Sequence, residues 1–336
     1  MLMKKLLYLL AVIFVLSLSI TGLSFGGDYA LYFPASEVST DDYNHWFSLV
    51  SLADPRTNPA GFDFKDTSIT VEAWIKPEKE MGVIAAGGNI SARKTTDGFA
   101  LYLWKGASST SQEGCASSGE SHCVKFAVRS NDTWYIATAL IPKALSNEWH
   151  HVAGAFDKGA GTLTVYVDGK ALPGADSNHL NSITGVPAMA DSGSTFIGLN
   201  QTFVPEIGIG SVNKNNEIIP KPVHWFKGTI DEIRLWREAR SQSQIESCMK
   251  KELGTSGDCK ITNTLATYLK FNEGSGATVH DTSGHGNNGS SRYYLMSKKV
   301  TKDHNVRVGY HTQVQDPESL EIQDPANWVP GYSLSK

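Results

Sequence analysis

Residues 68–76 have the sequence S-I-T-V-E-A-W-I-K, in which two sets of side chains alternate. One face carries apolar side chains, namely Ile69, Val71, Ala73 and Ile75. The other face carries Thr70, Glu72, Trp74 and Lys76. A period of two predicts a half-buried β-strand. A similar stretch, L-T-V-Y-V at residues 163–167, is followed by Asp168-Gly169, a pair typical of tight hairpin turns.

Short stretches of the same character recur on both sides and are separated by turn-forming residues. We expect further strands at 30–33, 45–50, 98–104, 123–129, 133–140, 149–156, 195–199, 226–236 and 266–271. So many short strands with little helical pattern between them predict an all-β antiparallel sandwich rather than a parallel α/β sheet. Three longer loops, at about 105–122, 173–193 and 200–224, interrupt the strands and are either binding loops or surface decoration.

One segment predicts a short helix that braces the sandwich. Ser241 can cap it and Gln244 completes a capping box, while Ile245, Cys248 and Met249 share one face. Gly254 lies where a left-handed residue would end the helix.

Composition and charge exclude several classes of protein. The chain has 336 residues, 40% of them hydrophobic, with 8 Trp, 12 Tyr and 13 Phe, so it can bury a substantial core. Thirty basic residues against 34 acidic ones leave a net charge of −4 without a basic block. A nucleic-acid partner is therefore not expected.

The N-terminus predicts export. Lys4 and Lys5 precede an apolar run at 6–20, and small residues follow at Gly22, Ser24 and Gly26. This is the pattern of a Sec-type signal peptide over residues 1–26, which would place the mature chain outside the cell or on its surface with no membrane span. An uncleaved membrane anchor is the alternative.

The four cysteines agree with an oxidising compartment. We favour two local disulfides, Cys115–Cys123 and Cys248–Cys259, among the three possible connectivities. A four-cysteine zinc site is the alternative, but the chain lacks the C-x-x-C spacing of such sites.

Four stretches together resemble one family. They are A-L-Y-F (30–33) leading to T-D-D-Y (40–43), I-T-V-E-A-W-I-K-P (69–77), N-E-W-H-H-V-A-G-A-F-D to V-Y-V-D-G-K (147–170), and F-K-G-T-I-D-E-I-R-L-W-R-E-A-R-S-Q-S-Q-I (226–245). They are similar to the laminin-G-like jelly-roll domain of the concanavalin A-like lectin/glucanase superfamily. The resemblance implies two face-to-face antiparallel sheets, often a bound Ca²⁺, and a role in binding glycans or a surface protein. The chain departs from the family pattern at Pro34-Ala35, where an Asp-Gly is usual.

The C-terminal part resembles a segment that begins such units in many bacterial surface proteins. It comprises Y-L-K-F-N-E-G-S-G-A-T-V-H-D-T-S-G-H-G-N-N-G (268–289) and W-V-P-G (328–331). We therefore divide the mature chain into a sandwich at 27–250 and an extension at 251–336. We favour pairing of the extension with its own sandwich over an incomplete second unit or a strand given to a neighbouring molecule. Residues 290–327 are expected to form a loose loop.

The resemblance also implies a calcium site. Asp231, in an I-D-x-I-R context, occupies the position of a frequent ligand, and Asp41 or Asp42 could add a second carboxylate. Alternatively, Asp231 pairs with Arg234 or caps a turn. The oxygen-rich stretch 281–289 lacks the spacing of an EF-hand loop, and we interpret it as a tight turn.

Glycan binding requires exposed aromatic rings beside polar groups. The candidates are Trp104, Trp134, Tyr135, Tyr166 and Trp225, with Trp134 and Trp225 favoured because polar loop residues lie nearby. The competing interpretation is that each packs in the core, as tryptophans of sandwiches usually do.

The sequence disfavours catalysis. A retaining glycosidase needs two close carboxyl groups, which a strand can supply as E-x-D-x-x-E, and the chain lacks that motif. Glu72 and Asp231-Glu232 could meet only through the fold, and His150-His151 are expected to be structural rather than metal ligands. We therefore favour a non-catalytic, calcium-stabilised binding protein. An extracellular glycosidase or lyase and a structural surface protein are the alternatives.

Overall fold

The computed structural model describes most of the sandwich. The described residues are 29–33, 45–52, 64–88, 97–107, 114–119, 121–131, 133–141, 143–189, 194–198, 226–254, 257, 259–300, 306–311 and 327–332. Among the helices of these segments, none is both long and apolar enough to cross a membrane.

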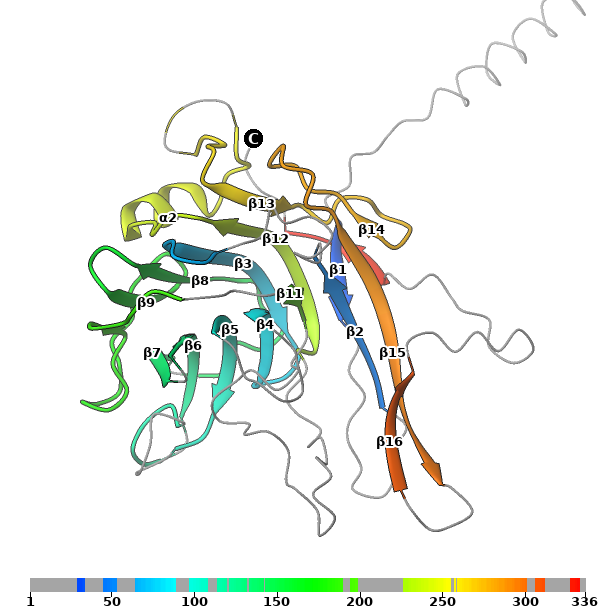
Figure 1. Cartoon of the computed structure of the whole chain (residues 1–336), viewed down its shortest axis with the longest axis horizontal. Helices are drawn as coiled ribbons and strands as arrows, with labels where there is room; N and C mark the ends of the chain where they lie inside the picture. Colours follow the sequence, from blue (N-terminus) through cyan, green and yellow to red (C-terminus); the bar gives the residue numbers. More distant parts are fainter. Residues whose placement is uncertain are drawn as a thin grey trace, which may run out of the picture.

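The described strands form two antiparallel sheets that face each other (Figure 1). The first sheet has the order β10 (Ser182–Ile183), β9 (Thr162–Val167), β8 (His150–Asp157), β3 (Ile69–Pro77), β12 (Gly228–Trp236), β1 (Tyr29–Phe33) and β17 (Asn327–Pro330), with β13 (Leu265–Leu269) also beside β12. The second has the order β14 (Thr278–Val279), β15 (Gly289–Val300), β2 (His45–Ser51), β11 (Ser194–Ile197), β4 (Gly82–Gly88), β5 (Gly98–Lys105), β6 (His122–Ser130) and β7 (Thr133–Ile141), with β16 (Val306–His311) beside β15. The predicted all-β sandwich is confirmed.

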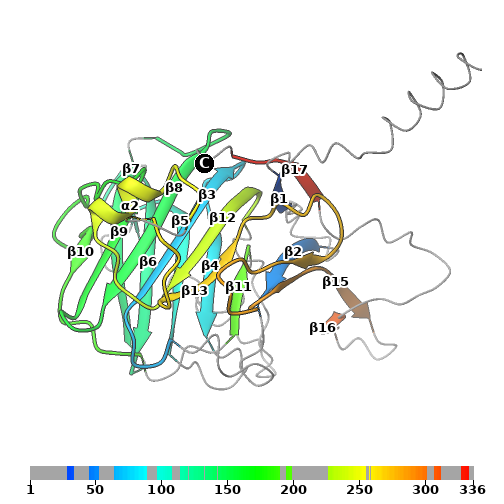
Figure 2. The same ribbon diagram turned by 90° about the horizontal axis from the view of Figure 1, so that it is seen from above.

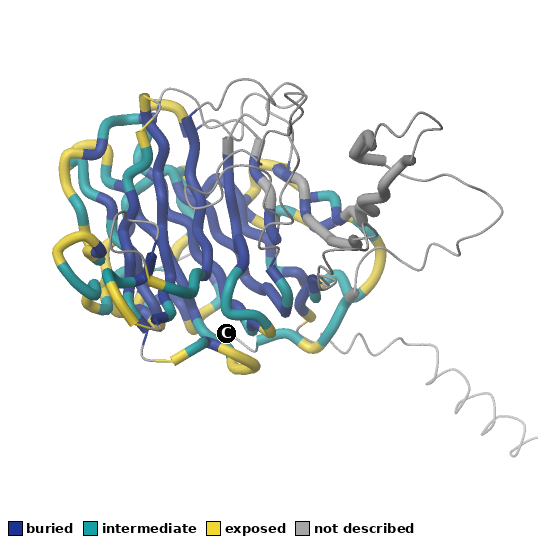
Figure 3. The backbone as a smooth tube through the Cα atoms, turned by 90° about the horizontal axis from the view of Figure 1, so that it is seen from below, coloured by how far each residue is buried: buried dark blue, intermediate teal, exposed yellow. Residues whose placement is uncertain are grey.

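The core lies between the sheets, where Ile69, Val71, Ala73 and Ile75 join the apolar side chains of the second sheet. Figure 3 shows the burial along the central strands. The sheets approach so closely that a Cβ on Gly154 would lie 2.1 Å from the ring of Phe126. A larger residue at 154 would therefore push the sheets apart.

The outer face of β3 differs from the expectation of a half-buried strand. Thr70, Glu72 and Trp74 are as buried as the core face. The reason is a covering layer made by helix α2 (Gln242–Cys248), which packs on the outer face of the first sheet (Figure 2), by the residues that flank the helix, and by Tyr332, which stacks on Trp74. The alternating sequence describes the strand correctly, but it carries no sign of this second covering layer.

Helix α2 begins as predicted and ends differently. The Ser241 side chain accepts from the Gln244 backbone N–H, and the Gln244 side chain accepts from the Ser241 N–H, which completes the capping box. The helix ends at Cys248 with Met249 as a right-handed cap, so the assignment of Gly254 as its left-handed end was wrong. The predicted disulfides Cys115–Cys123 and Cys248–Cys259 are both present.

The C-terminal strands pair with the body of their own chain. β13 pairs with β12, β15 with β2, and β17 with β1. The expected loose loop at 290–327 was wrong over β15 and β16, which form an antiparallel pair. β4 was also missed, because its sequence G-V-I-A-A-G-G is rich in residues that are uncommon in strands.

Candidate functional site

Two of the predicted glycan-binding residues lie on one face of the molecule. The outer face of the second sheet carries an apolar stripe of Val83, Ala86, Ala100, Tyr102, Ala127 and Ile136. Trp104 and Trp134 are partly buried and pack against this stripe. They come from β5 and β7, whose alternation turns these side chains away from the core.

The two tryptophans mark opposite ends of the stripe. Trp104 is on β5 opposite Cys123 of β6, and Trp134 is on β7 opposite Arg129 of β6. Cys123 and Arg129 lie six positions apart on that strand, which corresponds to about 20 Å. The middle of the face is closed, since Tyr102 is 1% exposed and Lys125 is fully buried. A ligand could therefore use one end or the other.

The Trp134 end combines an aromatic ring with charged and amide groups. The Arg129 guanidinium lies 5.9 Å from the centre of the Trp134 ring, within the range of a cation–π contact. The Asn131 backbone N–H donates to Asp97 Oδ1 at 3.0 Å, which ties the β6–β7 turn to the start of β5. Asn131 has a positive φ of 50° and is exposed, three residues before Trp134. The ring and the exposed amide are groups that can contact a sugar, whereas Arg129 is 8% exposed and supports the ring from below.

The Trp104 end is anchored differently. Tyr102 meets the Trp104 ring edge-on at 6.5 Å. Glu80 accepts from Lys105 at 2.7 Å and lies 3.0 Å from His122 Nε2. Hydrogen bonding from Lys105, opposed by burial and aided by His122, holds the pKa of Glu80 below its usual value. The Trp134 end is the better candidate, because Asn131 and Thr133 are exposed beside it.

Two other predicted ligand residues lie elsewhere: Tyr166 is buried against Ile245 of α2 on the first sheet, and Tyr135 faces the core. Tyr135 follows Trp134 on β7 and therefore points to the opposite side, where it packs against the main core. Trp225 lies outside the described residues. Arg129 was not predicted from the sequence. It lies two residues before the Asn131 turn and five before Trp134, and this spacing across a tight turn could have indicated that the two side chains are neighbours.

The outer face of the first sheet has the opposite character: it holds a buried network of charges beneath α2. Glu72 Oε1 accepts from Trp236 Nε1 at 2.7 Å and lies 3.5 Å from Arg240 Nε. Glu72 Oε2 lies 3.4 Å from His151 Nε2. The Arg240 guanidinium stacks 4.0 Å from the centre of the Trp236 ring. Glu72 therefore links β3, β8 and β12 to the segment that leads into α2.

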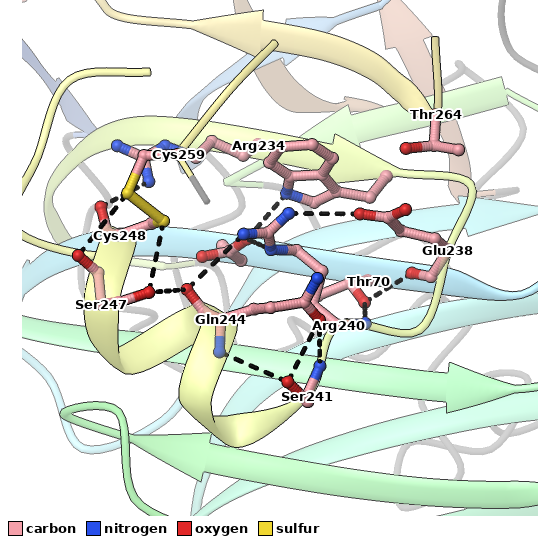
Figure 4. A network of polar contacts seen from close by, with 12 residues as sticks. Thr70, Arg234, Glu238, Arg240, Ser241, Gln244, Ser247, Cys248, Cys259 and Thr264 are labelled. Atoms are coloured by element: carbon pink, nitrogen blue, oxygen red, sulfur yellow. Dashed lines mark hydrogen bonds and ion pairs between the residues drawn. A yellow bond between two sulfur atoms is a disulfide. The ribbon is translucent and has the colours of Figure 1, made fainter. Parts of the chain in front are cut away.

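The same network fixes the segment that leads into α2 (Figure 4). Arg240 donates from Nη1 to Glu238 Oε1 at 3.2 Å, and its backbone N–H donates to Thr70 Oγ1 at 2.9 Å. The Thr70 hydroxyl in turn donates to the Glu238 carbonyl at 2.7 Å. Arg234 donates to the carbonyls of Cys248 and Lys251, so the end of the helix is held as firmly as its start.

A second carboxylate lies in the same layer. Arg234 Nη2 donates to Glu232 Oε2 at 3.2 Å, and the Tyr268 hydroxyl donates to the same oxygen. Burial raises the pKa of Glu232 despite the opposing charge of Arg234. Burial would also raise the pKa of Glu72, but His151, Arg234 and Arg240 hold it below its usual value.

Two carboxyl groups with pKa values moved in opposite directions are typical of acid–base pairs in glycosidases. Here access decides against that function. Glu72 is 1% exposed, Glu232 is 5% exposed, and both lie in the layer that α2 and the 248–259 disulfide loop complete. A sugar chain cannot reach either carboxyl in this structure. The fold thus brings Glu72 and Glu232 into one network, but as structural groups.

The predicted calcium ligands are only partly described. Asp231 is buried, with Oδ1 accepting from the Glu232 N–H and Oδ2 from the Tyr332 N–H, both at 2.8 Å. Asp41 and Asp42 lie outside the described residues. Within the described segments, no three His, Cys, Asp or Glu side chains gather as a cation would need. These residues alone therefore do not fit a calcium shell of six to eight oxygens.

The other polar candidates take part in turns and in the buried network. In the 281–289 turn, Asp281 accepts from the N–H groups of Tyr268, Ser283 and Asn287, as expected for a turn. His150 Nδ1 lies 2.9 Å from Asp168 Oδ2, while His151 belongs to the Glu72 network. Asp168 and Gly169 both have positive φ and form the predicted tight turn.

Several solved structures are similar to this chain at low identity and low TM-score. A protein of Bacteroides ovatus ATCC 8483, described as carbohydrate-binding, is 19% identical with a TM-score of 0.44, and the alignment covers 84% of this chain and 60% of that protein. A pentraxin of Limulus polyphemus is 15% identical with a TM-score of 0.37, covering 66% of this chain and 83% of the pentraxin. Domains LG4-5 of the mouse laminin α1 chain are 11% identical with a TM-score of 0.38, covering 62% and 41%. This chain thus spans less than two thirds of the Bacteroides protein, and none of these similarities says what it binds.

The sequence itself is more decisive about family. No curated protein matches the chain. Residues 50–246, more than half of the chain, match the family model of laminin-G-like domains described as the concanavalin A-like lectin/glucanases superfamily. Together with the two-sheet fold, this match shows that the chain belongs to the laminin-G-like family of that superfamily.

Proposed function

We propose that this chain is a secreted, non-catalytic carbohydrate-binding protein whose sugar site is the Trp134 end of the second sheet. The observation that carries the proposal is the partly exposed Trp134 ring beside Arg129 and the Asn131 turn. A pyranose presents an apolar C–H face to an aromatic ring and hydroxyl groups to amides and charges at the ring's edge. Membership of a lectin/glucanase superfamily supports the same class of ligand.

The non-catalytic part of the proposal rests on access. Glu72 and Glu232 are the paired carboxyl groups that the fold brings together, and both are buried. The retaining-glycosidase motif is absent from the sequence.

Export and calcium complete the proposal. Two disulfides support an oxidising compartment, in line with the signal peptide expected over residues 1–26. Calcium binding by Asp231 with Asp41 or Asp42 stays a prediction. It requires a higher melting temperature in Ca²⁺ than in chelator, since a ligand of the native state raises stability.

A glycan array tests the function directly. The wild-type chain, without residues 1–26, should bind at least one glycan class, and Trp134→Ala should weaken that binding at least about tenfold, as truncating an aromatic anchor does. Trp104→Ala is the matched control, because it removes the same ring from the other end of the stripe. Absence of binding to every glycan, with and without Ca²⁺, would reject the proposal.

A further inference from the structure

The last described segment, N-W-V-P-G-Y at residues 327–332, is bound by the body of the chain as an added strand. β17 pairs antiparallel with β1, with Tyr29 opposite Pro330 and Tyr32 opposite Asn327. In the described sheet it stands at the end of the strand order, so β1 is its one neighbouring strand there.

Two aromatic side chains anchor this segment. Trp328 packs against the main core, and its Nε1 donates to the Gly276 carbonyl at 3.2 Å. The Tyr332 ring stacks on Trp74 with centroids 3.6 Å apart and planes 13° from parallel. Trp149 meets Tyr332 edge-on at 5.9 Å. Trp74 and Trp149 therefore form an aromatic pocket for the ring of Tyr332.

Asp231 and Gly331 fix the backbone between the anchors. The Tyr332 N–H donates to Asp231 Oδ2 at 2.8 Å. A Cβ on residue 331 would lie 2.3 Å from the Tyr29 carbonyl oxygen and 2.6 Å from Asp231 Oδ2. Only glycine fits this close approach, so the site selects the sequence of its occupant as well as its shape.

A strand added to a sheet edge, with side chains in pockets, is a general mode of peptide recognition. In the described sheet the segment is paired on one side, so its opening breaks the β1–β17 ladder and withdraws Trp328 and Tyr332 but separates no other pair of strands. Sixteen peptide steps separate His311 from Asn327, enough chain to span about 50 Å when extended. Pro330 lacks an N–H, which discourages a further strand on the outer edge of β17.

We propose that the β1 edge, the Trp74–Trp149 pocket and Asp231 form a binding site for this C-terminal segment, and that a second copy of the chain supplies the segment when copies are crowded. The exchanged contacts are identical to those within one chain. Because the segment and its site belong to one chain, their local concentration is on the order of millimolar, and one copy fills its own site in dilute solution. Exchange then joins copies that are held at comparable concentration, independently of sugar binding.

Two complementary full-length variants test the exchange. Trp74→Ala removes the pocket and keeps the segment, whereas Tyr332→Ala keeps the pocket and removes the anchor. Mixed at about millimolar concentration, they should form a 1:1 dimer by light scattering, while each alone stays monomeric. The double variant mixed with either one is the control and should give no dimer. A mixture that shows only monomers would overturn the proposal.

Trp74 also donates to the Met249 carbonyl at 2.6 Å, so Trp74→Ala can unfold the chain. A second measurement therefore uses only Tyr332→Ala. A fluorescent peptide N-W-V-P-G-Y should bind Tyr332→Ala at least tenfold more tightly than it binds wild type. The peptide N-W-V-P-G-Y should also bind Tyr332→Ala at least tenfold more tightly than the peptide N-W-V-P-A-Y does, because the site has no room for the added Cβ. Equal binding of the two peptides, or none, would contradict the proposed site.

Discussion

The two outer faces of the sandwich bury opposite kinds of side chain. The first sheet carries Glu72, Arg234 and Arg240, sealed beneath α2 by hydrogen bonds and a disulfide. The second carries an apolar stripe, with Lys125 and Arg129 buried beside it, and its tryptophans are partly exposed at the ends of the stripe. Residue type alone would place function at the charged face. Burial argues for the other face, because charges that pair with one another in the interior hold the fold, while a partly exposed ring can be reached by a ligand.

Removing one charge from the buried network should have the largest effect on stability. Glu72→Gln leaves Arg240 and His151 without their buried partner and should lower the free energy of unfolding by about 3–5 kcal/mol. Denaturant titration measures this loss. Glu80→Gln, which breaks an ion pair of the second sheet that is about one third exposed, is the control and should cost less than about 1 kcal/mol. Similar losses for both variants would remove the contrast between the faces.

Removing the disulfide of the first sheet's outer face should cost more stability than removing the disulfide of the second sheet. Replacing Cys248 and Cys259 by Ser opens a loop of sequence separation 11 and frees the end of α2, and we expect a loss of about 2–4 kcal/mol. The Cys115 and Cys123 double variant opens a shorter loop, of separation 8, and should lose less. Thermal unfolding of both variants ranks them, and the reverse order would show that α2 does not depend on its disulfide.

Asp231→Ala should have an intermediate effect. The substitution deprives the Glu232 and Tyr332 N–H groups of their acceptor and should cost about 1–3 kcal/mol. Measuring unfolding in chelator separates this loss from any contribution of calcium. Because Tyr332 stacks on Trp74, the tryptophan fluorescence of the variant should also change. An unchanged spectrum and stability would mean that Asp231 does not hold the C-terminal segment.

The smallest effect concerns acid stability. The hydrogen bond with His179, then the Ser117 and Asn178 N–H groups, hold the pKa of Asp176 well below its usual value. The contribution of Asp176 to the free energy of unfolding is therefore complete above about pH 4, and it is lost as the pH falls towards the folded-state pKa of this carboxyl group. The melting temperature of Asp176→Asn should fall less steeply than that of wild type between pH 5 and pH 3. If the melting temperatures of the two proteins fall in parallel, other carboxyl groups cause the loss of stability in acid.

Much of the fold could be predicted from the sequence, because alternation reports directly which face of a strand meets the core. The strand at 68–76, the capping box at Ser241 and both disulfides follow from local patterns. β4 could not be predicted in this way, since its glycines and alanines follow no strand pattern and it is held by its neighbours β5 and β11.

The site was harder to predict because it depends on contacts between distant residues. Trp134 could be named, but only the register of β6 and β7 places Arg129 beside it. Glu72 and Glu232 could be listed as carboxyl groups, but nothing local shows that α2 buries them. The stacking of Tyr332 on Trp74 joins residues 258 positions apart, and no sequence pattern announces it.

A single titration tests the central claim, that the half-exposed aromatic end binds sugar and the buried carboxyl pair does no chemistry. The best oligosaccharide from the array is titrated into wild type and Trp134→Ala by calorimetry, and each sample is then assayed for new reducing ends. We predict saturable binding by wild type, at least about tenfold weaker binding by the variant, and no reducing ends in either. Reducing ends released by wild type and lost in Glu232→Gln would contradict the account.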